Sequence, residues 1–389
     1  DGRLNLLNVL NPPLVGDLVV NTRIPYDPND PNTFSVTIQG AIDDAINGDE
    51  LIASPGVYYE NIDFTGKAIT LRSGDVNDYA DANVSPETTT IFGGGNGSVV
   101  TFHSNEDSST VLKGLSIKGG YANFGGGISC DSSSPTIEDC VIQANGAKYY
   151  GGGIDLYLSD ALIINCHISN NSASDGGAIN SELDLSTVIS CEIVGNSSTD
   201  VGGAVQAVDS SLQLINCLIT NNQSGDVGGA IYLYNSDAQV SNCTIADNSG
   251  HDNFGGVYCD STDQDEPTII DSILWSNGIS LYNCDGLVSY SCVEGGTSGA
   301  TNTDQDPNFI AGYYLRSTAA GQLVDSPCID TGSADADDPN IGLDHLTTRT
   351  DQIPDAGRVD MGYHFEPMAA VPTFRLITGV NDANMGVIE

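Results

Sequence analysis

The sequence predicts an all-β protein, a right-handed parallel β-helix of roughly ten coils with a short capping helix near its N-terminus. Three observations support this fold class: a cysteine-centred repeat, a second repeat built on Gly-Gly, and a composition poor in helix-forming residues. Only 16% of the 389 residues are charged, whereas 45 residues are glycine. Such a composition argues against an ordinary helical or α/β enzyme.

The cysteine repeat has a period of 25 or 26 residues. In segments such as IEDCVIQAN and LINCLITNN, an isoleucine follows the cysteine by two residues and an asparagine follows it by five. The repeated cysteines are Cys140, Cys166, Cys191, Cys217 and Cys243, and Ser272 takes the next place. The strand-forming runs are too short for a helical solenoid, so each period indicates one coil of a β-helix. Equivalent residues of successive coils then stack about 4.8 Å apart.

The second repeat places a glycine pair before the next short strand. GGGI, GGAI and GGAV recur in step with the cysteines, beginning at Gly125, Gly151, Gly176, Gly202 and Gly228. We expect these glycines to allow a tight turn into the strand, and the cysteine and isoleucine ladders to be buried with reduced thiols. We expect the asparagine ladder to occupy left-handed turn positions, with each amide bonded to its neighbour.

Several segments resemble known families. The GGAI and I-x-x-N elements, as in ITNNQSGDVGGAIY, resemble the repeats of polymorphic outer-membrane proteins, with Ile or Leu in place of Phe. The segment TIQGAIDDAINGDELIASPGVYYENIDFTGKAITLRS resembles the opening of pectin-lyase-like β-helices, and the text from DPNF to MGYHF resembles the end of large secreted bacterial β-helix proteins. The resemblance implies a secreted or cell-surface protein, and it is specific for fold and not for activity.

The chain divides into three parts. Residues 1–32 form a lead-in or linker that ends in the Pro- and Asp-rich YDPNDPN, and residues 33–365 form the β-helix with its caps. We expect a helix at about 37–47, coils from about 50 to 330, and a C-terminal cap after them. Residues 366–389 are a tail or the start of a further domain. The apolar runs LNLLNVL, DLVVN and FRLITGV are candidate strands, and we expect at least one of these two tails to pair with a neighbouring copy or domain.

The charge excludes two classes of partner and favours another. With 52 acidic residues against 11 Lys and Arg, the formal net charge is −41, which argues against nucleic-acid binding and membrane-surface binding. No run of 18 apolar residues exists, so we expect no membrane insertion. Such a chain attracts cations, and Ca²⁺ is the expected ion, with no organic cofactor. The candidate metal ligands are Asp175, Asp200, Asp226, Asp335, Asp337 and Asp338.

Polar and aromatic residues follow each glycine pair at positions that should face outward. The candidate carbohydrate-binding residues are Asp155, Tyr157, Glu182 and Tyr234. If the protein is an enzyme, Asp155 and Glu182 on adjacent coils would be its catalytic carboxylates, as in a polysaccharide hydrolase. A polyuronate lyase needs a Lys or Arg, and none lies between Lys148 and Arg316. The catalytic sets of pectin methylesterases and polygalacturonases are also missing.

Two functions follow from these observations. The first is a non-catalytic structural or adhesive module, extracellular or on the cell surface, that could self-assemble into a layer or filament. Its partners would be other copies of itself, other extracellular proteins or polysaccharide. The alternative is a carbohydrate-active enzyme, a polysaccharide hydrolase or lyase, that acts on an outward groove of the β-helix.

Overall fold

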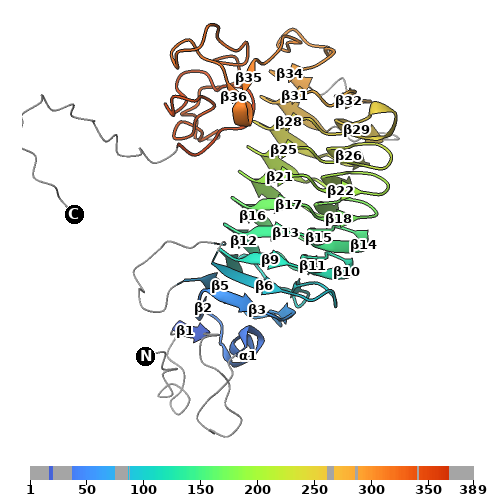
Figure 1. Cartoon of the computed structure of the whole chain (residues 1–389), viewed down its shortest axis with the longest axis vertical. Helices are drawn as coiled ribbons and strands as arrows, with labels where there is room; N and C mark the ends of the chain where they lie inside the picture. Colours follow the sequence, from blue (N-terminus) through green and yellow to red (C-terminus); the bar gives the residue numbers. More distant parts are fainter. Residues whose placement is uncertain are drawn as a thin grey trace, which may run out of the picture.

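The chain forms a right-handed parallel β-helix, as the sequence predicts. The computed structural model describes residues 17–20, 37–74, 86, 88–260, 267–284, 288–339 and 341–367. Short strands stack in one elongated column, and an irregular C-terminal segment lies beside the last coils (Figure 1). Within these ranges the strands form three long parallel sheets, one shorter parallel sheet and one two-stranded antiparallel sheet. No helix in the described ranges is long and apolar enough to cross a membrane.

The first sheet has eleven strands and begins each coil. Its strands are β1 (Asp17–Val20), β2 (Glu50–Ala53), β5 (Thr70–Ser73), β8 (Val111–Lys113), β12 (Thr136–Glu138), β16 (Leu162–Ile164), β20 (Thr187–Ile189), β24 (Gln213–Ile215), β27 (Gln239–Ser241), β30 (Thr268–Ile270) and β33 (Val288–Ser289). The predicted strand DLVVN is therefore β1, which pairs in parallel with β2 and covers that edge of the first sheet. The other predicted tail strands lie outside the described residues.

The second sheet follows the first within each coil and has ten strands. They are β3 (Gly56–Tyr58), β6 (Thr89–Phe92), β9 (Ser116–Lys118), β13 (Val141–Gln143), β17 (His167–Ser169), β21 (Glu192–Val194), β25 (Leu218–Thr220), β28 (Thr244–Ala246), β31 (Ile273–Trp275) and β34 (Cys292–Val293). The middle residue of the three-residue strands from β9 to β31 points inward, and the predicted ladder from Ile142 to Ile245 is fully buried.

The third sheet ends each coil and has nine strands. They are β4 (Ile62–Asp63), β7 (Val100–Phe102), β11 (Ile128–Asp131), β15 (Ile154–Tyr157), β19 (Ile179–Glu182), β23 (Val205–Val208), β26 (Ile231–Tyr234), β29 (Val257–Asp260) and β32 (Leu281–Tyr282). A fourth sheet lies between the second and third and comprises β10 (Tyr121–Phe124), β14 (Gly146–Tyr150), β18 (Ser172–Ala173) and β22 (Ser197–Ser198).

Glycine pairs make the entry to the third sheet. The first glycine of each pair has a positive φ, for example 64° at Gly151, which a glycine adopts without strain. The second glycine lies against the next coil, since a Cβ on Gly152 would come within 2.4 Å of the carbonyl oxygen of Gly177. The glycine repeat therefore reflects both a turn conformation and the close spacing of coils.

A short helix covers the N-terminal end. Helix α1 (Ile38–Asp44) is capped by the Thr37 side chain, which accepts a hydrogen bond from the backbone N–H of Gly40. Its apolar residues Ile38, Ala41 and Ile42 are buried. The predicted helix is therefore present, and it ends at Asp44, earlier than the expected end at about residue 47.

The number of coils differs from the prediction. About seven turns make up the regular repeat, which corresponds to the coils between Val111 and Tyr282. The two preceding coils lack a strand in the fourth sheet, and the last partial coil ends at β34. Roughly ten coils extending to about residue 330 were predicted because the sequence period does not reveal that winding stops at Val293.

A buried asparagine ladder joins successive coils. Its members are Asn145, Asn171, Asn196, Asn222, Asn248 and Asn277. The side-chain amide of Asn196 donates to Ile168 O at 2.9 Å and to Asn222 Oδ1 at 3.0 Å, and its backbone N–H donates to the same Oδ1 at 2.9 Å. The same pattern repeats along the ladder, so each buried amide contacts the coils on either side.

The left-handed conformation falls on a different residue from the one predicted. The positive φ angles belong to the residues just before the ladder asparagines: Ala144, Asn170, Gly195, Asn221, Asp247 and Ser276. The ladder asparagine turns its side chain inward and donates to its neighbours, and the preceding exposed residue makes the bend. The predicted bonding between neighbouring amides is confirmed.

The cysteine ladder is buried and reduced, as predicted. All five repeated cysteines are free thiols with at most 2% exposure. Ser272 continues the ladder because its hydroxyl accepts a hydrogen bond from the backbone N–H of Cys243 at 3.1 Å. Among the described cysteines, one disulfide joins Cys259 to Cys284 on adjacent coils, outside this ladder.

The C-terminal segment runs along the side of three coils. The backbone of His364 exchanges two hydrogen bonds with the Asn216 side chain, of 2.7 and 3.0 Å, and Tyr363 N–H donates to Thr244 Oγ1 at 3.0 Å. The Asp271 carboxylate accepts hydrogen bonds from the backbone and hydroxyl of Ser333. Each of these coil residues lies in or beside the turn between the first and second sheets, so the segment fastens successive turns together.

We predict that Asn196→Ala destabilises the fold by about 3 kcal/mol or more, because it leaves the buried donors of Asn171 without their acceptor. The free energy of unfolding in urea measures the effect. The control is Asn170→Gly, at an exposed residue with φ of 55°, which should change stability by less than about 1 kcal/mol. Equal losses in the two variants would contradict a special role for the ladder.

Candidate functional site

The predicted outward residues form two parallel rows on the third sheet. Residues of one row stack in the order Ser129, Asp155, Asn180, Gln206, Tyr232, Tyr258 and Tyr282. Residues of the other row stack in the order Asp131, Tyr157, Glu182, Val208, Tyr234 and Asp260. The structure therefore brings all four candidate carbohydrate-binding residues onto one face, because equivalent strand positions repeat in every coil.

Asp155 is the most perturbed carboxyl of this face. Asp155 is only 6% exposed, and its Oδ1 accepts a hydrogen bond from Asn180 Nδ2 at 2.8 Å. Burial, and to a smaller extent the charge of Glu182, raises the pKa of Asp155 to about 7. Near neutral pH the side chain therefore exists in both protonation states, which is unusual for an aspartate.

Asp155 and Glu182 are diagonal neighbours. Asp155 pairs with Asn180, and Tyr157 pairs with Glu182, so the two carboxylates lie one coil and two residues apart on the same face. A diagonal of this kind separates their α-carbons by about 8 Å, given the usual strand spacing and rise. Glu182 is half-buried, whereas Asp155 is almost covered. The pair thus combines one solvent-accessible carboxylate with one that few ligand atoms can reach.

Gln206 adds an unpaired acceptor to the same row. Gln206 is 8% exposed, and its Oε1 has no hydrogen-bond partner among the described residues. A buried carbonyl oxygen without a donor costs free energy, which a hydroxyl or water hydrogen could recover.

Two aromatic clusters lie at opposite ends of the polar residues. The first comprises Phe124, Tyr149 and Tyr150 on β10 and β14, with Phe124 stacked on Tyr150 at a centroid distance of 5.7 Å. The pKa of the Tyr150 hydroxyl is raised by burial and then by the charges of Asp175, Glu182 and Asp155.

The second cluster continues the row itself. The rings of Tyr258 and Tyr282 stack at 4.6 Å, Tyr232 stacks on Tyr258 at 5.9 Å, and Phe254 packs edge-on against two of them. Sequence reasoning named Tyr157 and Tyr234 and missed both clusters. The recurrence of Tyr at the row positions after each glycine pair was a usable signal for the second cluster, whereas the first cluster depends on the fourth sheet.

The predicted metal ligands do not converge on one site. Asp200 and Asp226 lie one coil apart, since the backbone N–H of Asp226 donates to Asp200 O at 2.8 Å. The pKa of Asp175 is raised by burial, with a smaller contribution from the charge of Asp200. Neither these three residues nor Asp335, Asp337 and Asp338 belong to a cluster of three ligand atoms in the described part of the chain. The Ca²⁺ expectation therefore remains a hypothesis at these positions.

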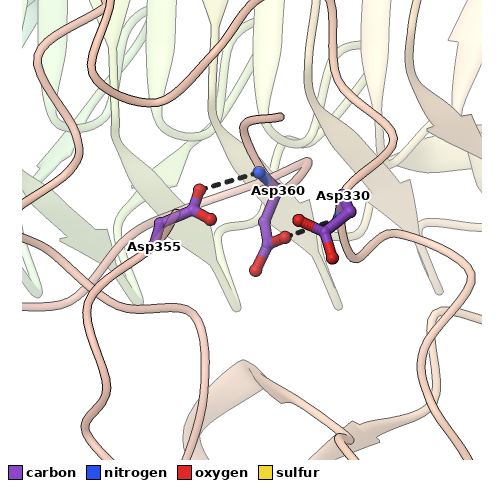
Figure 2. A group of neighbouring side chains, drawn as sticks. All are labelled: Asp330, Asp355 and Asp360. Atoms are coloured by element: carbon purple, nitrogen blue, oxygen red, sulfur yellow. Dashed lines mark hydrogen bonds between the residues drawn. The ribbon is translucent and has the colours of Figure 1, made fainter. Parts of the chain in front are cut away.

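A different acidic cluster lies in the C-terminal segment. Carboxylate oxygens of Asp330, Asp355 and Asp360 lie within 4.8 Å of one another (Figure 2). Asp360 accepts hydrogen bonds from Asp330 N–H at 2.7 Å and from the Thr348 hydroxyl, and burial followed by the charge of Asp355 raises the pKa of Asp360 to about 6. Asp355 Oδ2 lies 2.9 Å from His364 Nε2. These contacts stabilise the segment, and the three carboxylates could also hold a divalent cation.

Comparisons with known proteins agree with the fold. Residues 123–271 match the model of the right handed beta helix region family. A solved structure, described as "Crystal structure of pectate lyase Pel9A", superposes with a TM-score of 0.50 at 13% identity, over 89% of this chain and 96% of that one. At this identity the likeness concerns the fold alone. No curated protein matches the sequence. The resemblance to polymorphic outer-membrane protein repeats stays a prediction.

We predict that Asp155→Asn stabilises the protein at pH 8 by up to about 4 kcal/mol and has little effect at pH 4. The pKa of Asp155 in the folded chain is raised above 3.8, so the folded state keeps a proton that the unfolded state loses. The contribution of the protonated group is fully present below about pH 4 and is lost as the pH rises through 7. Urea unfolding at both pH values measures it.

The control for this experiment is Asp131→Asn on the same face. Asp131 is exposed, and its charge is only a minor cause of the raised pKa of Asp155, so its substitution should change the pH dependence of stability much less than Asp155→Asn does. A pH profile that does not differ between wild type and Asp155→Asn would show that Asp155 titrates as an ordinary aspartate.

We hypothesise that Ca²⁺ relieves the repulsion among Asp330, Asp355 and Asp360. Millimolar Ca²⁺ should then raise the melting temperature above that in Na⁺ of equal ionic strength, and Asp360→Asn should remove most of this rise. The control is Asp200→Asn, which tests the other candidate position. An equal melting temperature in both salts would rule out a stabilising calcium site.

Proposed function

We propose that this chain is a non-catalytic, extracellular adhesive β-helix module that binds polysaccharide on the outward face of the third sheet. The single observation that carries the proposal is the solvent-accessible row that contains Tyr157, Glu182 and Tyr234, together with the two aromatic clusters. Aromatic faces stack on sugar rings, and carboxylate and amide groups bond to sugar hydroxyls. Both kinds of side chain recur along the coils, which suits a polymer with a repeating unit.

The charge favours a neutral polymer. The chain carries a formal charge of −41, and no Lys or Arg occurs between Lys148 and Arg316. A polyuronate would be repelled by this face, because its carboxylates would meet those of Asp155 and Glu182 without a cation between them. We therefore propose a neutral polysaccharide as the partner.

The low exposure of Asp155 argues against catalysis. A general acid must come within hydrogen-bond reach of the glycosidic oxygen, and Asp155 is only 6% exposed. The enzyme remains the second candidate because a pKa of about 7 suits a general acid and because diagonal carboxylates suit an inverting hydrolase. In that case Asp155 would be the acid and Glu182 the base.

Self-association is a further part of the proposal. Within the described residues, β3 has no partner strand on its N-terminal side and β32 has none on the side away from β29, whereas the backbone of Asp63 in β4 is already bonded to the Gln39 side chain of helix α1. Such edges present backbone hydrogen-bonding groups to a neighbouring copy. End-to-end contact would produce the filament or layer that the repetitive sequence suggested.

We predict that the protein binds at least one neutral polysaccharide and releases no product from it. Retardation in gels containing β-glucan, xylan, galactomannan or polygalacturonate measures binding, and a reducing-end assay measures cleavage. The double variant Phe124→Ala/Tyr149→Ala should weaken binding about tenfold through the loss of two exposed rings. Tyr59→Ala, which removes an exposed tyrosine near the N-terminal end, is the matched control.

Two outcomes would contradict the proposal. Release of sugar that disappears in Asp155→Asn would support the hydrolase. Failure to bind any of the polymers would contradict the adhesive part of the proposal, and only the structural role would remain.

A further inference from the structure

A pocket lies away from the third sheet, where the last coils meet the C-terminal segment. It has a volume of about 410 Å³ and lies between the outward ends of β28 and β31 and the segment that contains β35 (Phe309–Ile310), the 3-10 helix η4 (Ala311–Tyr313) and β36 (Tyr314–Leu315). Figure 1 shows β35 and β36 beside these coils. The pocket is lined by Ala246, Asp247, Trp275, Ser276, Asp306, Phe309, Ile310, Gly312 and Tyr313.

Three aromatic rings form part of the pocket wall. Trp275 is half-buried and stacks one coil beyond Ala246. Phe309 and Tyr313 pack edge to face at a centroid distance of 5.5 Å and an angle of 85°. The indole N–H of Trp275 has no hydrogen-bond partner among the described residues. The rings therefore offer π-faces and edges to a ligand.

The polar part of the wall is negative. Asp247 and Asp306 are both exposed, and no Lys, Arg or His lines the pocket. Tyr313 donates its hydroxyl hydrogen to Asp247 Oδ2 at 2.8 Å, which keeps this carboxylate at the wall. Glu294 accepts from the backbone N–H of Ser276 at 2.7 Å and adds a further negative charge nearby.

We propose that this pocket binds an alkylammonium group, carried either by a small organic cation or by an amino sugar. Aromatic faces attract an ammonium group through their quadrupole, and carboxylates attract it through its charge. A neutral ligand of the same shape would gain the stacking contacts and lose both electrostatic contributions. The ligand class follows from these contacts and does not depend on polysaccharide binding at the third sheet.

The only tryptophan of the chain, Trp275, makes the test specific for this pocket. Tryptophan fluorescence is titrated with choline and with its neutral isostere 3,3-dimethylbutanol, and binding is checked by calorimetry on the same samples. Choline should perturb Trp275 and bind at least about tenfold more tightly than the isostere. Glucosamine and N-acetylglucosamine form a second pair that distinguishes an amino sugar from a small cation.

Charge-neutral variants test the carboxylates. Asp247→Asn should weaken choline binding about fivefold, and Asp247→Asn combined with Asp306→Asn should weaken it more than tenfold. The matched control is Asp209→Asn, because Asp209 and Asp247 are both exposed and have φ angles of 47° and 56°, which asparagine adopts readily. This control should bind choline like the wild type.

Three results would overturn the proposal. Equal affinity for choline and its isostere would show that charge does not select the ligand. Unchanged affinity for choline in the double variant would show that the carboxylates of Asp247 and Asp306 do not contribute to binding. Absence of both a fluorescence change and a calorimetric signal for choline and glucosamine would show that the pocket binds no alkylammonium group.

Discussion

The buried asparagine ladder is the interaction on which the rest of the structure depends. Each ladder amide, as at Asn196, donates to both neighbouring coils and accepts from the preceding one, so its bonds are satisfied only when successive coils keep one register. An insertion or deletion that displaced one asparagine would leave buried donors without acceptors on both sides. This requirement explains why the regular coils keep nearly the same length. It also aligns every other position of the coil, including those that face solvent.

The same register arranges the functional face. Outward residues after the glycine pairs lie outside the apolar core, yet they stack as regularly as the core residues because both lie on the same strands. Polar residues such as Asp155 and Asn180 therefore meet across coils, and tyrosines such as Tyr258 and Tyr282 stack as a column. The two carboxylates of this face differ in burial: Asp155 is almost covered and its pKa is raised to about 7, whereas Glu182 is half-buried.

The irregular C-terminal segment has two consequences for the molecule. It holds three coils together through Asn216, Thr244 and Asp271, which bond to residues between 62 and 148 positions away in the sequence. It also creates the aromatic, negatively charged pocket beside Trp275, because it supplies Asp306, Phe309 and Tyr313 to the wall. Binding surfaces thus arise both from the repetition of coils and from the place where repetition ends.

The sequence alone determined the fold class, the inward ladders, the N-terminal helix and the rows of outward residues, since periodicity directly encodes which residues stack. It did not determine where winding stops or which residue takes the left-handed conformation, because both depend on how the backbone closes each coil. Nor did it reveal the cluster of Asp330, Asp355 and Asp360 or the aromatic group at Phe124 and Tyr150. The three aspartates share no period, whereas Phe124 and Tyr150 are one period apart in a segment outside the cysteine and glycine repeats; only tertiary packing shows that these side chains meet and how far they are buried.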